Sequence, residues 1–340
     1  MLLILIEIQR FTNLFLYFSF KKLSNLIWLC ISFLIPRTGI QRREKLLPFF
    51  ISVEISNYCN LHCPECPVGN KEFLTLQRKN FNFKLYKNLV DQLAPTLTHI
   101  ILYFQGEPFL NNRLMELIRY AHTAHIYTST STNGQFLTKK NAREIVLSGL
   151  DKLIVSVDGS TQEVYEKYRV GGNLSKTIKG IKQVMDWKKK LKSSTPFVEI
   201  QFLVFKTNEH QMGDMKQLAK SLHVDNLTFK TAQLYDFEKG HELMPTKKRF
   251  SRYQMGKNGL FRMKGNLANH CWRLWSGAVV NATGEVLPCC FDKGSDFSFG
   301  NINESTFSEC WHSKKAVNFR KKICQNRKQF EMCRNCTSHY

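Results

Sequence analysis

The chain has 340 residues, of which 43% are hydrophobic, so it has enough apolar residues for a sizeable core and about two domains. Charged residues make up 22% of the sequence, which excludes a largely disordered chain. The formal net charge of +22 fits either a polyanionic partner (nucleic acid, a phosphorylated substrate or anionic lipid) or a basic, soluble surface.

Residues 1–48 are predicted to form a hydrophobic, basic helical extension. Two apolar stretches, Phe11–Phe20 and Leu26–Pro36, are separated by a pair of lysines. Neither reaches the roughly 18 apolar residues of a membrane-spanning helix. We expect amphipathic helices that either bind an anionic membrane surface through residues 1–45 or pack on the rest of the protein.

Residues 49–235 alternate short apolar strands with amphipathic helices, a pattern typical of parallel βαβ units. The six predicted strands are Ile51–Ser56, His99–Tyr103, Ile126–Thr130, Leu153–Val157, Val198–Val204 and Leu227–Phe229. The five predicted helices are Tyr86–Leu93, Leu114–His122, Lys139–Leu147, Ser175–Lys190 and Glu209–Leu222. The fold class is therefore α/β, a partial (β/α)6 TIM-type barrel, in which chemistry occurs on the loops after the strands.

The remaining residues are predicted to form two further segments. Residues 236–265 are polar and are interpreted as a connector. Residues 266–340 are rich in cysteine and form a small α+β domain, with a hairpin around Asn281–Gly284.

Eleven cysteines require an explanation, and their odd number argues against a fully paired disulfide framework. The N-terminal apolar run lacks the basic start of a cleavable signal peptide, so we expect a cytoplasmic protein, in which clustered cysteines bind metals or do redox chemistry. Cys59, Cys63 and Cys66 follow the first strand. Three thiolates at this spacing can hold three irons of a cubane and leave the fourth open, whereas a zinc site needs a fourth ligand, such as His62.

This CX3CX2C pattern resembles the radical S-adenosylmethionine (radical SAM) superfamily. The resemblance implies a [4Fe-4S] cluster whose open iron binds S-adenosylmethionine, and an external electron donor of the flavodoxin or ferredoxin type. It also implies reductive cleavage to a 5′-deoxyadenosyl radical, which abstracts a substrate hydrogen. Glu65 stands where many family members have an aromatic residue.

Other loops after the strands support the same resemblance. Gly106-Glu107-Pro108 resembles the motif that aligns the amino group of bound S-adenosylmethionine, with Gln105 in place of its first glycine. The resemblance implies that Asn133, Ser156 and Arg169 bind the cofactor as well; each is otherwise an ordinary cap or turn residue. Two carboxyl groups, those of Asp158 and Glu199, are candidates for a general base.

The last cysteines form a second candidate site. Cys271, Cys289, Cys333 and Cys336 suit either zinc or a fully ligated cluster. With Gly284 five residues before Cys289, they resemble the SPASM and twitch extensions of radical SAM enzymes, which implies one auxiliary [4Fe-4S] cluster.

The predicted function is an oxidoreductase-type radical SAM enzyme, and the reaction is an oxidative modification, either a dehydrogenation or a cross-link, of a peptide or sugar-type substrate. The alternatives are a GTP cyclase-like molybdopterin enzyme, a cluster-bearing electron carrier, and a zinc or iron–sulfur protein that binds nucleic acid. The first alternative uses three auxiliary cysteines, and a nucleic-acid partner is disfavoured because paired finger spacing is missing. The sequence does not identify the substrate.

Overall fold

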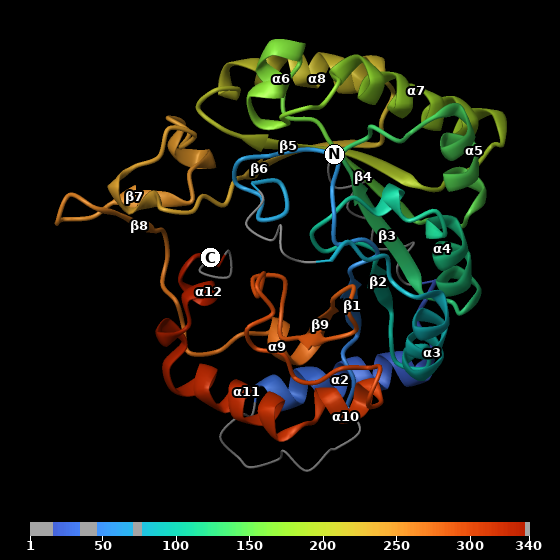
Figure 1. Ribbon diagram of the computed structural model, residues 1–340, viewed down its shortest axis with the longest axis vertical. Helices are drawn as coiled ribbons and strands as arrows, with labels where there is room; N and C mark the ends of the chain where they lie inside the picture. The colour runs from blue at the N-terminus through green and yellow to red at the C-terminus, as the bar shows by residue number, and fades with distance from the viewer. Residues whose placement is uncertain (1–15, 35–45, 71–76, 337–340) are drawn as a thin grey trace.

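The computed structural model describes residues 16–34, 46–70 and 77–336. Its main feature is an eight-stranded sheet in the order β10-β9-β1-β2-β3-β4-β5-β6, which curves into a partial barrel with helices on its outside (Figure 1). The predicted α/β partial barrel is confirmed. A second sheet contains β7 and β8 alone.

The six predicted barrel strands are present and are parallel to one another. They are β1 (Phe50–Val53), β2 (His99–Ile101), β3 (Tyr127–Thr132), β4 (Lys152–Ser156), β5 (Phe197–Val204) and β6 (Asn226–Thr231). Because all six run in one direction, their carboxyl ends meet at one rim of the barrel, where the predicted motifs lie.

The outer helices are α3 (Phe83–Leu93), α4 (Leu114–Thr123), α5 (Lys139–Leu147), α6 (Gln162–Tyr168), α7 (Leu174–Lys190) and α8 (Met212–Ser221). Side chains of Asn82, Thr138 and Asn173 accept hydrogen bonds from backbone amides in the first turns of α3, α5 and α7, which explains where these helices begin. The sequence pattern does not predict α6, because seven residues are too few for a clear helical period. Short 3-10 turns are η1 (Pro108–Leu110) and η2 (Glu209–Gln211).

The cysteine-rich segment continues the barrel sheet. Strand β9 (Gly277–Val280) pairs in parallel with β1, and β10 (Val286–Leu287) pairs antiparallel with β9, as the predicted hairpin. The helices of this segment are α9 (Arg273–Ser276), α10 (Phe307–Trp311), α11 (Lys314–Asn326) and α12 (Glu331–Arg334), with η5 (Arg327–Gln329) between the last two. The continuous sheet places the second group of cysteines beside the barrel.

The predicted connector has a hairpin of its own. Strands β7 (Tyr253–Met255) and β8 (Phe261–Met263) pair antiparallel, and two 3-10 turns, η3 (Phe237–Lys239) and η4 (Lys248–Phe250), precede them. Buried Tyr253 stacks on Phe237 with ring centres 4.1 Å apart. The polar composition of the segment obscured these strands, because each of them is only three residues long.

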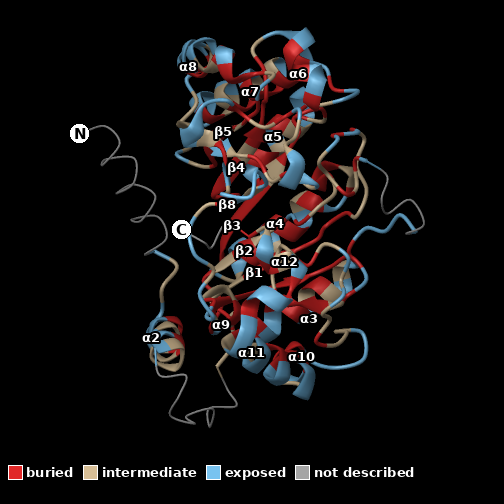
Figure 2. Ribbon diagram, turned by 90° about the vertical axis from the view of Figure 1, so that its left-hand side faces the viewer, coloured by how far each residue is buried: buried red, intermediate tan, exposed pale blue. Residues whose placement is uncertain are grey.

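One helix, α2 (Phe20–Leu34), contains the adjacent lysines Lys21 and Lys22 and lies at the edge of the view in Figure 2. Its Lys22 is buried, and the ammonium group donates a hydrogen bond to the carbonyl of His125. On the same inner side, the Phe33 ring lies 5.3 Å from that of Trp272. This part of the extension therefore packs on the core; residues 1–15 and 35–45 lie outside the described residues. In the described ranges, no helix has both the length and the apolar character needed to cross a membrane.

Candidate active site

The loop after β1 carries the first cysteine group into a cavity of about 270 Å³. Cys59, Cys63 and Cys66 all line it, and Cys63 is 6% exposed. The amide of Cys66 donates to the carbonyl of Cys63 at 3.1 Å, which turns the loop so that its thiols share this wall. His62 is exposed and does not line the cavity, so it lies away from the three thiols.

Gly106 brings the loop after β2 into contact with the cysteine loop. A Cβ atom at this position would lie 2.3 Å from the carbonyl oxygen of Ser56 and 2.5 Å from that of Tyr58. Both distances are too short for any side chain, so only glycine allows this approach. The next amide, that of Glu107, donates to the Tyr58 carbonyl at 2.9 Å and joins the two loops.

The Glu107 carboxylate organises the end of β3. It is 2% exposed and accepts hydrogen bonds from Thr132 Oγ1 at 2.7 Å, from the Asn133 amide at 2.8 Å and from the Phe109 amide at 3.1 Å. Burial raises the pKa of Glu107, and these donors oppose that shift. Pro108 begins η1 directly after it. The carboxylate therefore holds the neighbouring backbone in place at the cavity wall.

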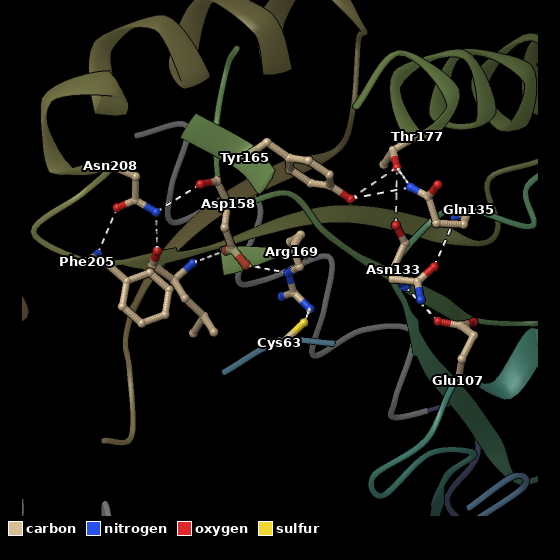
Figure 3. A network of polar contacts seen from close by, with 11 residues as sticks. Cys63, Glu107, Asn133, Gln135, Asp158, Tyr165, Arg169, Thr177, Phe205 and Asn208 are labelled. Carbon is tan, nitrogen blue, oxygen red and sulfur yellow. Dashed lines mark hydrogen bonds and ion pairs between the residues drawn. The ribbon is translucent and has the colours of Figure 1, made fainter. Parts of the chain in front are cut away.

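Asn133 connects that wall to the cysteine loop. Its amide nitrogen Nδ2 lies 2.9 Å from Asn60 Oδ1 and 3.7 Å from Cys59 Sγ. Figure 3 shows Asn133 between Glu107 on one side and Gln135 and Thr177 on the other. Ser156, at the end of β4, also lines the cavity.

Arg169 lies between a buried carboxylate and a cysteine (Figure 3). Its Nε donates to Asp158 Oδ2 at 2.6 Å, and its Nη1 lies 3.8 Å from Cys63 Sγ. Asp158 is fully buried and also accepts from the Leu203 amide at 2.6 Å. Arg169 therefore places its permanent positive charge beside the Cys63 thiol.

The structure argues against both carboxyl groups named as general bases. Neither Asp158 nor Glu199 lines the cavity. Asp158 is occupied by Arg169, and Glu199 is 2% exposed with its Oε2 3.1 Å from Lys152 Nζ. Both side chains serve ion pairs in the barrel wall.

Several cavity residues were not predicted as site residues. Tyr103, Gln201, Tyr235, Arg252 and Lys293 all line it. Glu65, which replaces the aromatic residue of the family, accepts a hydrogen bond from the Tyr235 amide at 2.7 Å and so joins the cysteine loop to the chain after β6. Two residues gave a signal in the sequence. Glu65 departs from the family pattern, and Gln201 is a polar residue on an apolar strand.

The second group of cysteines also meets in the structure. Cys271, Cys289, Cys333 and Cys336 line one small cavity, together with Arg327. Arg327 is 2% exposed, and its Nη2 lies 3.7 Å from Cys336 Sγ. Cys290 belongs to a different wall, where Arg273 Nη1 lies 3.6 Å from its sulfur.

Both thiol groups fit iron–sulfur clusters. Within the described ranges, no three histidine, cysteine, aspartate or glutamate side chains converge on a point that would hold a single metal ion. A cubane does not require such convergence, because each thiolate binds its own iron. The first set has three thiols beside an open cavity, which suits a cluster with one free iron. The second has four thiols around an enclosed space, which suits full ligation.

Comparisons with known proteins give the same result. The family model described as the radical SAM superfamily matches residues 53–201, and the SPASM model, an iron–sulfur cluster-binding domain, matches residues 271–337. The PqqA peptide cyclase of Bradyrhizobium diazoefficiens is 25% identical over 293 residues, which are 80% of this chain and 75% of that protein.

Two further proteins are similar. The AdoMet-dependent heme synthase of Methanosarcina barkeri is 25% identical over 318 residues, covering 81% of this chain and 84% of that protein. The crystal structure of Streptococcus suis SuiB bound to S-adenosylmethionine superposes with a TM-score of 0.62 at 13% identity, covering 85% of this chain and 72% of that one, and it shares the fold. The chain therefore belongs to the radical SAM superfamily, with a [4Fe-4S] cluster and S-adenosylmethionine as cofactors, and carries a SPASM domain for auxiliary iron–sulfur binding.

Proposed function

We propose that this enzyme cleaves S-adenosylmethionine beside Cys59, Cys63 and Cys66 and uses the resulting radical for an oxidative modification of its substrate. The observation that carries the proposal is that two neighbouring cavities share a wall. Tyr103, Phe104, Gln233 and Lys293 are among the residues that line both the 270 Å³ cavity and a second one of about 210 Å³. The second cavity reaches Cys289 of the other thiol group.

When bound, the first cluster would supply the electron that cleaves S-adenosylmethionine to methionine and a 5′-deoxyadenosyl radical, and the second would accept one electron from the substrate radical, whose proton would pass to water. The protein itself holds and orients the reactants. Cys59, Cys63 and Cys66 ligate the first cluster, and Cys271, Cys289, Cys333 and Cys336 ligate the second. Arg169 offers a cation to a carboxylate at the first site.

The other cofactor-binding residues position the loops and the polar groups around the cofactor. Gly106 allows the close approach of two loops, and Glu107 fixes the Asn133 backbone by accepting its amide at 2.8 Å. Asn133 and Ser156 then present an amide and a hydroxyl group to the bound cofactor.

The substrate in this proposal is a peptide side chain or a small sugar-type molecule, and the product is a dehydrogenated or cross-linked form of it. The 210 Å³ cavity is smaller than the roughly 300–1,000 Å³ of ordinary ligand pockets, so one side chain or one small molecule fills it. The similarity to a PqqA peptide cyclase favours the peptide. The four thiols of the second group argue against the GTP cyclase-like alternative, which uses three.

Two partners complete the proposal. A flavodoxin- or ferredoxin-type protein reduces the first cluster. An anionic membrane surface contacts the outer face of α2, where Phe20 is 90% exposed, Leu23 46% and Ile27 50%. Lys21, next to Phe20 in the sequence, is exposed too, whereas Lys22 is buried against the barrel and does not face lipid.

The proposal is tested by measuring 5′-deoxyadenosine after anaerobic reconstitution and reduction with dithionite. The wild type is expected to produce it from S-adenosylmethionine, and Cys59→Ala, Cys63→Ala and Cys66→Ala are each expected to abolish it. Cys290→Ala is the matched control, because Cys290 lies on another wall. Undiminished product from any of the first three variants would refute the assignment.

A further inference from the structure

Two cations face the cavity that lies between the thiol groups. Arg273 and Lys293 are both partly buried and both line its wall. Much of the remaining wall is apolar, including Phe50, Ile101 and Val279. An apolar space with two positive groups at its edge is chemically specific, because few uncharged molecules gain from both features.

The contacts that hold the two cations include no ion pair with a carboxylate. Lys293 Nζ lies 4.9 Å from the centre of the Phe104 ring, and its backbone carbonyl accepts from Gln105 Nε2 at 3.0 Å. Arg273 Nη1 contacts the sulfur of Cys290 at 3.6 Å. In residues 16–34, 46–70 and 77–336, no carboxylate lies within ion-pair distance of either cation.

Glu54 is the carboxyl group that interacts with Lys293 over a longer distance. It is 5% exposed, and its Oε2 accepts from the Ala282 amide at 3.0 Å. Burial raises the pKa of Glu54 to about 7, so this group is partly neutral near neutral pH. When Glu54 is neutral, the positive charge of Lys293 is available to a ligand.

The two cations also connect the cavity to its neighbours. Lys293 lines the 270 Å³ cavity as well, and Arg273 lines the space shared by Cys271, Cys289, Cys333 and Cys336. A group bound to both therefore lies between the two candidate cluster sites. Partly buried charges without a counterion lose solvation, and an anionic ligand offsets that loss with charge-assisted hydrogen bonds.

We propose that the substrate carries an anionic group, a carboxylate or a phosphate ester on an apolar body, and that Arg273 and Lys293 bind this group. The inference rests on the proposed function and specifies its substrate class. Arg273 offers a planar pair of donors and Lys293 a point charge, which together fit either oxyanion. The apolar wall receives the carbon skeleton from which hydrogen is abstracted.

The test uses three probes that each carry one phenyl ring: benzoate, its neutral isostere benzamide, and phenyl phosphate. Their binding to the reconstituted enzyme in the presence of S-adenosylmethionine is measured by calorimetry. At least one anionic probe is expected to bind ten or more times more tightly than benzamide, and Arg273→Met and Lys293→Met are each expected to weaken it by about tenfold. Benzoate and phenyl phosphate distinguish the carboxylate from the phosphate.

Charge-matched controls come from the β7–β8 hairpin, where Lys257 and Arg262 are exposed. Lys257→Met and Arg262→Met are expected to leave probe binding unchanged. Equal binding of benzamide and both anions to the wild type would overturn the proposal. So would a loss of S-adenosylmethionine binding in Lys293→Met, which would assign Lys293 to the cofactor. Because binding is measured without turnover, a failure to form 5′-deoxyadenosine refutes only the proposed function.

Discussion

Arg327 and Cys336 are in contact inside the second thiol group, with Nη2 3.7 Å from Sγ. The guanidinium is almost fully buried, and its Nη1 donates to the His270 carbonyl at 3.0 Å. A buried arginine is costly unless a negative charge compensates it. Four thiolates around a cluster supply that charge, so Arg327 is the expected counterion of the auxiliary site.

Replacing Arg327 with methionine is expected to make the reduction potential of the auxiliary cluster more negative, because a positive charge favours the reduced form. Arg327→Lys keeps the charge and is expected to shift the potential less. An EPR-monitored redox titration measures it in the Cys59→Ala/Cys63→Ala/Cys66→Ala background. Arg320→Met is the control, since Arg320 is partly buried in the same segment against Trp311 and the Leu274 carbonyl. Equal shifts in the Arg327 and Arg320 methionine variants would contradict this role.

The buried ion pair of Arg169 and Asp158 predicts strong coupling between the two residues. Arg169→Met leaves a fully buried carboxylate without its partner and is expected to cost about 3–5 kcal/mol of stability. Asp158→Asn added to that variant is expected to recover part of the loss. Thermal unfolding of the four proteins in a double-mutant cycle measures the coupling. Strictly additive losses would show that the pair is not coupled.

Glu54 predicts a pH dependence of stability. Its pKa of about 7 in the folded protein lies above the value of about 4.5 for a free glutamate, so folding favours the protonated form. The resulting stabilisation is complete below pH 4.5 and is lost as the pH rises through 7. The stability of Glu54→Gln relative to the wild type is therefore expected to increase across this range, by up to about 3 kcal/mol. Melting temperatures of both proteins at several pH values check this, and parallel curves would exclude it.

The barrel was predictable because its signals are local. Each strand is a short apolar run, and β5, for example, differs from its predicted span by one residue. The cysteine spacing likewise lies within eight residues of sequence. The features of the fold that the sequence did not predict depend on strand pairing between segments far apart in the chain. The contact of β9 with β1 joins segments more than 200 residues apart, and no local pattern specifies it.

The same limit applies to the site. Lys293 and Arg273 reach the 210 Å³ cavity only because the hairpin continues the barrel sheet, so neither was predicted as a site residue. Asp158 and Glu199 were candidates for a general base, but neither lines the cavity, and both are buried in ion pairs of the barrel wall. Side-chain direction and salt-bridge partners are tertiary properties, which single-sequence patterns do not encode.

The outer face of α2 predicts binding to anionic vesicles. Phe20→Asp/Ile27→Asp places charges on that face, and co-sedimentation with phosphatidylserine-containing liposomes is expected to fall. The binding of the wild type is expected to weaken with salt. Met255→Asp, at a residue 57% exposed on β7, is the control and is expected to bind as the wild type does. If the wild-type protein stays in the supernatant at low salt, α2 packs on the core and does not bind the membrane.

The central claim is that two thiol groups hold two clusters with different tasks, and EPR of two variants tests it most directly. The Cys271→Ala/Cys289→Ala/Cys333→Ala/Cys336→Ala protein is expected to hold about four irons and to show a reduced signal that changes when S-adenosylmethionine is added. The Cys59→Ala/Cys63→Ala/Cys66→Ala protein is expected to hold about four irons as well, with a signal that does not respond. A response to S-adenosylmethionine in the second variant, or its absence in the first, would contradict the account.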